Sequence, residues 1–326
     1  MIIICGETLI DLVPAGDDLW RALPGGSPAN TAVALARLSL PTAMLARISG
    51  DAFGAQLRRR LALGGVDLRY VVDAAEPTTL AIVDLDDAGG ARYTFHLDGT
   101  ADWQWTPAEF PAHFSDDVTA IHAGSMALIR PPGGDVLELL LAREKPHRVI
   151  SIDPNVRASM CPDPLRYSEI IERWLGLAHV VKASADDVAW LYPGRSFDDV
   201  LADWASRGPA VVVLTLGGDG AVGRTPTGPT VRVEGLTVDV IDTIGAGDTF
   251  SAGLLYALDA QGCLDVEALS RLTPAALEAA LCFAVRVSAL TCTREGADPP
   301  TLTEVEVAFP ALAEPLAAGV VSLPAE

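Results

Sequence analysis

Residues 242–253 read Asp-Thr-Ile-Gly-Ala-Gly-Asp-Thr-Phe-Ser-Ala-Gly (DTIGAGDTFSAG), a run of small residues between two acids. The apolar residues that follow have helical spacing and end near a glycine: Phe250, Leu254, Leu255, Leu258 and then Gly262. The small residues therefore stand at a helix N-terminus, where free N–H groups and the helix dipole bind anions. Glycine lets a phosphate approach the backbone because it has no Cβ.

Asp248 falls in the first turn of this helix, where an aspartate by itself is most often a cap. Its neighbours favour a second role. An N–H cluster stabilises charge on a transferring phosphoryl group, and a carboxylate at its edge can accept a hydroxyl proton. The run lacks the GK[ST] of a Walker A loop and the G-x-G-x-x-G of a dinucleotide site. It contains the parts that a small-molecule kinase needs.

The rest of the chain predicts an α/β fold. Six strand-like apolar stretches alternate with helical patterns: residues 1–7, 43–49, 118–124, 148–154, 178–184 and 210–217. Short strands that are apolar on both sides predict a parallel sheet covered on both faces. A further strand-like stretch, residues 237–242, leads into the small-residue run and places Asp242 at its end.

Two segments, at about 12–26 and 78–105, break this rhythm with polar-apolar alternation and turn residues. They predict hairpins of a small, half-exposed antiparallel sheet that serves as a lid or a dimer surface. An edge hairpin of the main sheet remains the alternative. Three tryptophans of these segments, Trp20, Trp103 and Trp105, are expected to pack there. No linker or repeat divides the chain, so residues 1–326 are expected to form a single domain.

Composition limits the partners and the location. A net charge of −20 would repel nucleic acid and anionic membranes. The five scattered cysteines predict reduced thiols in the cytoplasm. The opening MIIICGETLIDLV has no basic leader, and no stretch reaches the roughly 20 apolar residues of a membrane helix.

A second motif, GGSPANTAVALARLS, occupies residues 25–39. Gly25 and Gly26 predict a tight turn, Ser27 an N-cap and Pro28 the first helical position. Asn30 is then an amide near a helix start, which on its own is another capping residue.

These two motifs resemble signatures of the ribokinase-like, PfkB-type carbohydrate kinases. GDAFG at 50–54, DPNVR at 153–157 and LTLGGDGA at 214–221 are also similar to the family, so the resemblance spans roughly residues 1–300. It implies a three-layer core, with a mostly parallel central sheet between helices, and a small β-sheet lid.

The resemblance implies that Asp248 is the general base for the attacking sugar hydroxyl. The backbone of Gly245, Ala246 and Gly247 would form the anion hole, and Asp242 would fix the loop. In several family members this region also helps to hold a monovalent cation, such as K⁺, through backbone oxygens.

The implied sugar site combines the turn at Gly25 and Gly26 with Asp11, Asn30 and Arg157. The implied nucleotide contacts are backbone and side-chain groups of four residues: Ser184, Thr215, Gly217 and Gly220. The family's N-x-x-E element, which orders magnesium-bound water, aligns with Ser184 to Asp187. Serine and aspartate here replace asparagine and glutamate; Asp186 is an alternative oxygen donor, and both acids can instead be solvated at a helix start.

Within the family, these sequence motifs most resemble those of bacterial fructokinases. We therefore expect an ATP- and Mg²⁺-dependent kinase that phosphorylates a terminal hydroxymethyl group, with fructose as the first candidate. Ribose, 2-keto-3-deoxygluconate and nucleosides are the alternatives, and a non-catalytic sugar or nucleotide sensor is the alternative of another class. For His96, a sugar contact and a position on the sheet surface are equally expected. A homodimer that forms through the lid is a further expectation.

Overall fold

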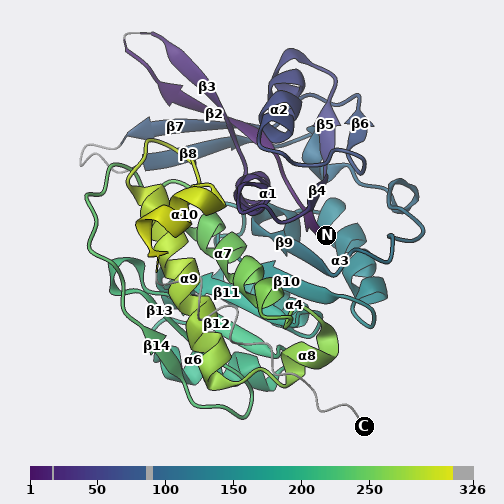
Figure 1. Ribbon diagram of the computed structural model, residues 1–326. Coiled ribbons are helices and arrows are strands. Elements are labelled where there is room, and N and C mark those ends of the chain that lie inside the picture. The colour runs from purple at the N-terminus through teal and green to yellow at the C-terminus, as the bar shows by residue number, and fades with distance from the viewer. Residues whose placement is uncertain (17, 86–90, 311–326) are drawn as a thin grey trace.

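The computed structural model describes residues 1–16, 18–85 and 91–310. An eight-stranded sheet dominates it, in the order β14-β13-β12-β11-β10-β9-β1-β4 (Figure 1). The pairs from β4 to β12 are parallel, and β13 and β14 extend the sheet in antiparallel fashion. Its strands are β1 (Ile2–Cys5), β4 (Thr42–Leu45), β9 (Ala120–Gly124), β10 (Val149–Asp153), β11 (Val180–Ser184), β12 (Val211–Thr215), β13 (Ala221–Arg224) and β14 (Val231–Val233).

The six predicted strand stretches are confirmed, with one subdivision. Residues 43–49 contain both β4 and β5 (Arg47–Ser49), and β5 leaves the main sheet to pair with β6 (Val72–Ala74). The expected strand at 237–242 is wrong, because these residues lie outside every strand. Val240 and Ile241 are 61% and 66% exposed, so the apolar pattern there does not reflect burial in a sheet.

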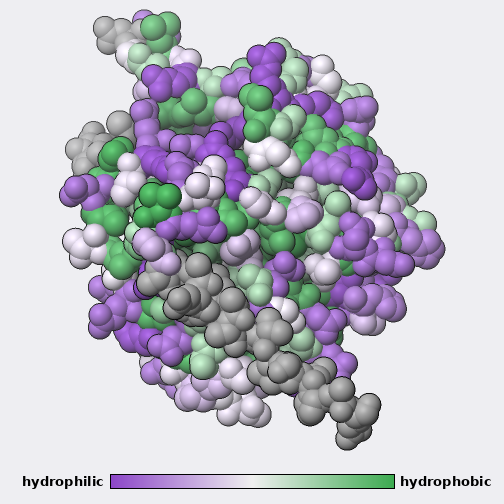
Figure 2. All heavy atoms as spheres, in the orientation of Figure 1, coloured by the Kyte–Doolittle hydropathy of each residue, from purple (hydrophilic) through white to green (hydrophobic). Residues whose placement is uncertain are grey.

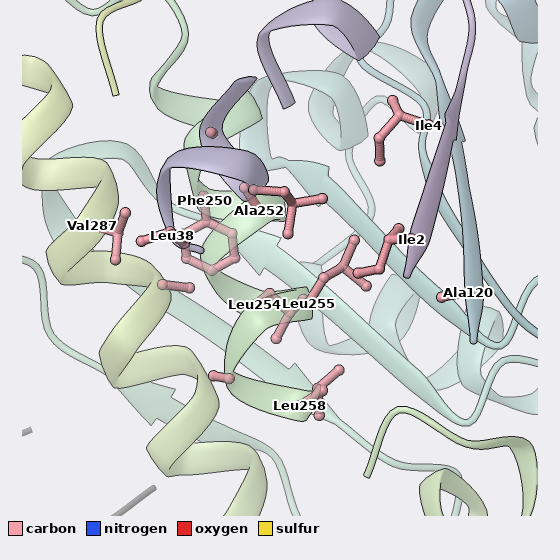
Figure 3. Close-up of a cluster of buried hydrophobic side chains, with 14 of the residues drawn as sticks. Ile2, Ile4, Leu38, Ala120, Phe250, Ala252, Leu254, Leu255, Leu258 and Val287 are labelled. Carbon is pink, nitrogen blue, oxygen red and sulfur yellow. The ribbon is translucent and has the colours of Figure 1, made fainter. Parts of the chain in front are cut away.

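Helices cover both faces of the main sheet, which confirms the three-layer core. Successive strand residues point to opposite faces, so Ile2 and Ile4 belong to one hydrophobic cluster and Ile3 to the other. The first cluster includes residues of α1, α7 and α9, and Figure 3 shows Leu255 of α7 beside Ile2 and Phe250 near Leu38. The second includes residues of α3, α4, α5 and α6.

The helices have the following bounds: α1 (Ser27–Arg37), α2 (Ala52–Leu63), α3 (Gly133–Glu144), α4 (Pro164–Leu175), α5 (Ala185–Leu191), α6 (Phe197–Ser206), α7 (Ala246–Ala260), α8 (Val266–Ser270), α9 (Pro274–Cys292) and α10 (Leu302–Ala308). Short 3₁₀ turns are η1 (Ala101–Trp103), η2 (Pro107–Glu109), η3 (Ser125–Leu128) and η4 (Gly217–Asp219). By length and composition α9 is apolar enough to cross a membrane. It packs along α7, with Leu281 and Val287 completely buried, so its place in the core accounts for its apolar sequence.

A separate four-stranded sheet lies against the main body, so these segments are not an edge hairpin of the main sheet (Figure 1). Its order is β3-β2-β7-β8, with β2 (Leu9–Pro14), β3 (Trp20–Gly25), β7 (Leu80–Leu85) and β8 (Ala91–His96). The expectation of a purely antiparallel sheet is wrong, because β2 and β7 pair in parallel. Each is the first strand of its hairpin, and both leave the core in the same direction. Residues 86–90, within the predicted hairpin segment 78–105, lie outside the described residues.

The three tryptophans do not share the small sheet as expected. Trp20 lies in β3 and is 48% exposed, whereas Trp103 is buried beneath the sheet beside Leu9 and Ala81. Trp105 stacks on Phe110 in the main core, with ring centroids 4.8 Å apart. The chain returns to the core after β8, which removes Trp103 and Trp105 from the sheet. Figure 2 shows hydrophilic residues interspersed with smaller hydrophobic groups over one face of the molecule.

Candidate active site

A cavity of about 820 Å³ lies between the small sheet and the carboxyl ends of the parallel strands. Residues at or just beyond the ends of β1, β9, β10, β11 and β12 line it, among them Glu7, Ser125, Asn155, Ser184 and Thr215. Ligands of open α/β sheets bind at this edge, because the loops there leave a crevice. The small sheet closes the other side with Leu9, Asp11, Tyr93 and Phe95.

The glycine loop lies at the N-terminus of α7, as the sequence predicts, and lines the cavity. Gly245 is the N-cap residue with φ of 77°, a left-handed conformation in which a Cβ would lie 2.8 Å from the Cβ of Ala297. The N–H of Ala246 donates to the carbonyl of Thr243 at 3.2 Å. Helix geometry gives the N–H groups of Gly247 and Asp248 no partner within the helix, so these two are available for an anion.

Two side chains of α1 hold the Asp248 carboxylate. The Ser27 hydroxyl donates to Oδ1 at 2.6 Å, and the Asn30 amide donates to Oδ2 at 2.9 Å. The expected N-cap role of Ser27 is wrong: the N-cap residue is Gly26, with φ of 102°, and no side chain caps the helix. The Ser27 hydroxyl is instead committed to Asp248, which lies 221 positions away in the sequence.

Burial decides the acidity of Asp248, which is only 6% exposed. Removal from water raises the pKa of its carboxyl group, and the charge of Asp153 adds to this effect. The hydrogen bonds from Ser27 and Asn30 and the charge of Lys182 oppose the rise in pKa. The carboxylate is thus a stronger base than a surface aspartate, and it is held in one orientation.

Of the predicted sugar residues, Asp11, Gly26, Asn30 and Arg157 line the cavity, and Asp11 and Arg157 mark its sugar end. Burial raises the pKa of Asp11 to about 6, against the opposing charge of Arg157. The Arg157 guanidinium donates to Asn155 Oδ1 at 2.6 Å. Gly25 lies behind Asp11, where a Cβ would overlap the Asp11 carboxylate.

Two aromatic rings of β8 complete the sugar end. Tyr93 and Phe95 are two residues apart, so both point to the same face of the sheet, and both line the cavity. Their rings stack at 5.9 Å between centroids. His96 is exposed and points away from the cavity, which leaves the surface interpretation for this residue.

The predicted nucleotide residues line the opposite end: Ser184, Thr215, Gly217 and Gly220. Ser184 and Asp187 form a capping box at the start of α5. One Asp187 oxygen accepts from the Ser184 N–H at 2.9 Å, and the other accepts from the Val156 N–H at 2.8 Å. The Asp187 carboxylate therefore fixes two loops, and the exposed Asp186 is the less constrained of the two acids.

The donor set suits a magnesium ion that arrives with the nucleotide. Over residues 1–16, 18–85 and 91–310, no three acidic, histidine or cysteine side chains form a metal cluster. Mg²⁺ keeps several waters and commonly binds through one or two carboxylates plus substrate phosphates. Asp186 and Asp187, at the edge of the phosphate end, fit that arrangement.

Asp242 lies outside the lining of the cavity and ties the glycine loop to the segment after α9. Its Oδ1 accepts from the Ile244 N–H at 3.0 Å, and its Oδ2 accepts from the Gly296 N–H at 2.8 Å. The N–H of Ile241 donates to the Cys292 carbonyl at 2.8 Å. These hydrogen bonds fix the glycine loop, although the residues before it form no strand.

The sequence analysis missed several cavity residues: Glu7, Ser27, Tyr93, Phe95, Asn155 and Lys182. Only Lys182 carried a usable signal, because it is one of two lysines in the chain and lies in a predicted strand. For the others the necessary information is how strands, loops and α1 are arranged around the cavity.

One cavity contains an anion-binding helix terminus, a buried carboxylate beside it and a separate end for a second substrate. This combination defines a small-molecule phosphotransferase of the α/β class. The family model described as "pfkB family carbohydrate kinase" matches residues 1–304, and the chain belongs to that family.

Fructokinases are prominent among the relatives. The chain is 38% identical to a fructokinase of Rhizobium leguminosarum bv. trifolii over 281 residues, which cover 85% of each chain. A double mutant of fructokinase from Vibrio cholerae O395, solved in a fructose-, ADP- and potassium-bound form, is 31% identical, with a TM-score of 0.82 and coverage of 94% of this chain and 97% of the other. A fructokinase from Xylella fastidiosa with bound ATP is 28% identical, with a TM-score of 0.88 and coverage of 96% and 99%.

Proposed function

We propose that this protein transfers the γ-phosphate of ATP to a terminal hydroxymethyl group of a sugar, with fructose as the favoured acceptor. The observation that carries the proposal is the position of Asp248. A buried carboxylate held by Ser27 and Asn30 adjoins the free N–H groups of a helix terminus, between a sugar-type end and a nucleotide-type end of one cavity.

In this mechanism Asp248 takes the proton of the attacking hydroxyl group. Its raised pKa makes it a better base than a surface aspartate, and the bonds to both of its oxygens fix the direction of attack. The loop of Gly245, Ala246 and Gly247 receives the charge that develops on the phosphoryl group, through the N–H groups and dipole of α7. No covalent intermediate with the protein is required.

The sugar is held by Asp11, Asn30 and Arg157, with Gly25 and Gly26 shaping the turn beside it. This end of the cavity combines the two acids Glu7 and Asp11 with the single arginine Arg157. Burial also raises the pKa of Glu7 to about 7. Such a site favours a neutral polyol over a carboxylate or a phosphate ester, and fructose, the ligand of the Vibrio structure, is neutral.

The nucleotide binds against Ser184, Thr215, Gly217 and Gly220. Asp187 would hold a nucleotide-bound Mg²⁺ through water, and the ion would neutralise charge on the phosphates. Backbone oxygens near Asp242 would hold a monovalent cation such as K⁺; the related Vibrio fructokinase was solved in a potassium-bound form.

The chain acts as one domain over residues 1–326 in the cytoplasm, where ATP is available. All five cysteines are free thiols, which suits a reducing compartment. Two copies associate through the small sheet. Three apolar residues at or near β3 support this surface: Leu19, Trp20 and Leu23, which are 64%, 48% and 38% exposed.

The test is ADP release with ATP and Mg²⁺ on a panel of fructose, ribose, 2-keto-3-deoxygluconate and a nucleoside. We expect the highest kcat/KM on fructose. A higher value on another acceptor would reassign the sugar, and no turnover on any acceptor would favour a non-catalytic sensor.

A further inference from the structure

Lys182 is a buried cation directly beneath the glycine loop. It lies in β11 and is 5% exposed, although lysine is among the residues least often buried. A Cβ built on Gly247 would lie 3.1 Å from the Lys182 ammonium nitrogen. The ammonium group therefore lies next to the glycine loop, and Lys182 itself lines the cavity.

The surroundings of Lys182 are strongly acidic. Its nitrogen lies 2.9 Å from Asp153 Oδ2, in an ion pair whose side chains are 6% and 2% exposed. The Ser251 hydroxyl of α7 donates to the same Asp153 oxygen at 3.3 Å. Burial by itself would lower the pKa of Lys182, but the hydrogen bond to Asp153 and the charges of Asp153, Asp187 and Asp248 outweigh it and raise the pKa. Asp153 thus links the Lys182 ammonium group to α7 beside the loop.

The cavity as a whole has few cations for a ligand as anionic as ATP. Among the described residues that line it, two side chains are positive, Arg157 and Lys182. Arg157 lies at the sugar end and donates to Asn155. Five lining side chains are acidic: Glu7, Asp11, Asp186, Asp187 and Asp248. Among the cavity-lining residues that the structure describes, Lys182 alone brings positive charge to the phosphate end.

We propose that Lys182 is the fixed cation of the phosphoryl-transfer site. Its ammonium group, oriented by Asp153, stabilises the negative charge that develops on the transferring phosphoryl group beside the glycine loop. A charge in a buried site acts strongly and needs no reorganisation during the reaction. This inference rests on the proposed kinase function, and Lys182 is a positioning and electrostatic residue rather than a proton carrier.

The first test compares Lys182→Met with Lys145→Met, the same change at the only other lysine, which lies on the surface. By analogy with the loss of one oxyanion donor, we expect kcat on the best sugar to fall about 100-fold in the first variant and to stay unchanged in the second. Binding of ADP with Mg²⁺ and aluminium fluoride, which mimics the transferring group, should weaken at least about 30-fold. Binding of ADP alone should change less than about threefold.

A second pair of variants separates this role from a merely structural ion pair. Removal of one partner from a buried pair leaves an uncompensated charge, whereas neutralisation of both partners often restores stability. We expect Asp153→Asn to keep activity within about tenfold of wild type, because the cation remains. Lys182→Met with Asp153→Asn should recover the melting temperature and stay about 100-fold low in kcat. This double variant also carries the test if Lys182→Met alone does not fold.

Recovery of activity in the double variant would overturn the proposal, and so would equal losses of affinity for ADP and for the fluoride complex. The binding measurements do not need an accepted sugar. Failure of the wild type to turn over any acceptor of the panel would refute the kinase function. The role of Lys182 would be refuted if Lys182→Met bound ADP with Mg²⁺ and aluminium fluoride as tightly as the wild type does. It would also be refuted if the wild type bound this complex no more tightly than ADP alone.

Discussion

The two ends of the cavity are built in different ways. At the phosphate end the working groups are backbone N–H groups and buried charges on the main sheet and α7, such as Lys182 and Asp248, 5% and 6% exposed. At the sugar end they are side chains, and a separate small sheet contributes Asp11, Tyr93 and Phe95, of which Tyr93 is 41% exposed. The core thus fixes the chemistry, and an adaptable surface selects the acceptor.

The sharpest way to test this division is Asp248→Asn. We expect kcat to fall by at least about 1,000-fold, because the amide cannot accept the proton, while ATP affinity stays within a few fold. Steady-state kinetics and ADP titration measure both quantities. Asp259→Asn, the same change near the other end of α7, is the control and should keep wild-type activity. A wild-type rate in Asp248→Asn would rule out the general-base role.

Substitutions at the sugar end should change the KM for the sugar. Asp11→Ala is expected to raise the KM for the sugar about 10- to 100-fold, because a buried hydrogen-bond acceptor for hydroxyl groups is lost, with the KM for ATP unchanged. Kinetics with each substrate varied in turn measure the split. Equal increases in both KM values would contradict a division between the two ends.

A smaller effect of the same kind is expected for Tyr93→Ala. Loss of one ring of the Tyr93–Phe95 stack removes apolar surface beside the sugar, so its KM should rise about three- to tenfold. The neighbouring Thr94→Ala changes an exposed side chain on the other face of β8 and is the matched control. A similar change in both variants would indicate a general distortion of the strand.

The smallest effect on activity is expected at the junction of the two regions. Asp102 accepts from the Thr8 N–H and the Thr79 hydroxyl group, at the entrances to β2 and β7. Burial raises its pKa to about 7 from 3.8, with the charge of Glu7 adding to the effect. The folded state therefore binds more protons than the unfolded state between about pH 4 and 7, and stability is lost as the pH rises through this window.

Asp102→Asn cannot ionise and keeps groups able to make both bonds. We expect its free energy of unfolding to exceed that of wild type by on the order of 2 kcal/mol at pH 8 and to equal it near pH 4. Urea denaturation across this range measures the difference. Asp98→Asn, whose parent side chain is 98% exposed, is the control and should show no such trend. A variant less stable than wild type at pH 8 would refute the pKa argument.

The sequence predicts the main fold well because local signals and burial agree there. The six apolar stretches between helical patterns are strands of the main sheet, and the N-terminus of α7 falls within the glycine loop. The errors come from patterns whose meaning depends on distant neighbours. Val240 and Ile241 look like a strand and lie exposed, and Ser27 looks like a cap and bonds to Asp248.

The sequence by itself determined the kind of chemistry, because an anion-binding helix terminus is encoded in consecutive residues such as Gly245 to Asp248. Tertiary structure decided which side chains serve it. Ser27, Asn30 and Lys182 come from α1 and β11, far from the loop in sequence, and meet it only where the parallel strands end. Burial at that meeting point sets the basicity of Asp248 and the charge of Lys182, and burial is a property of the folded chain alone.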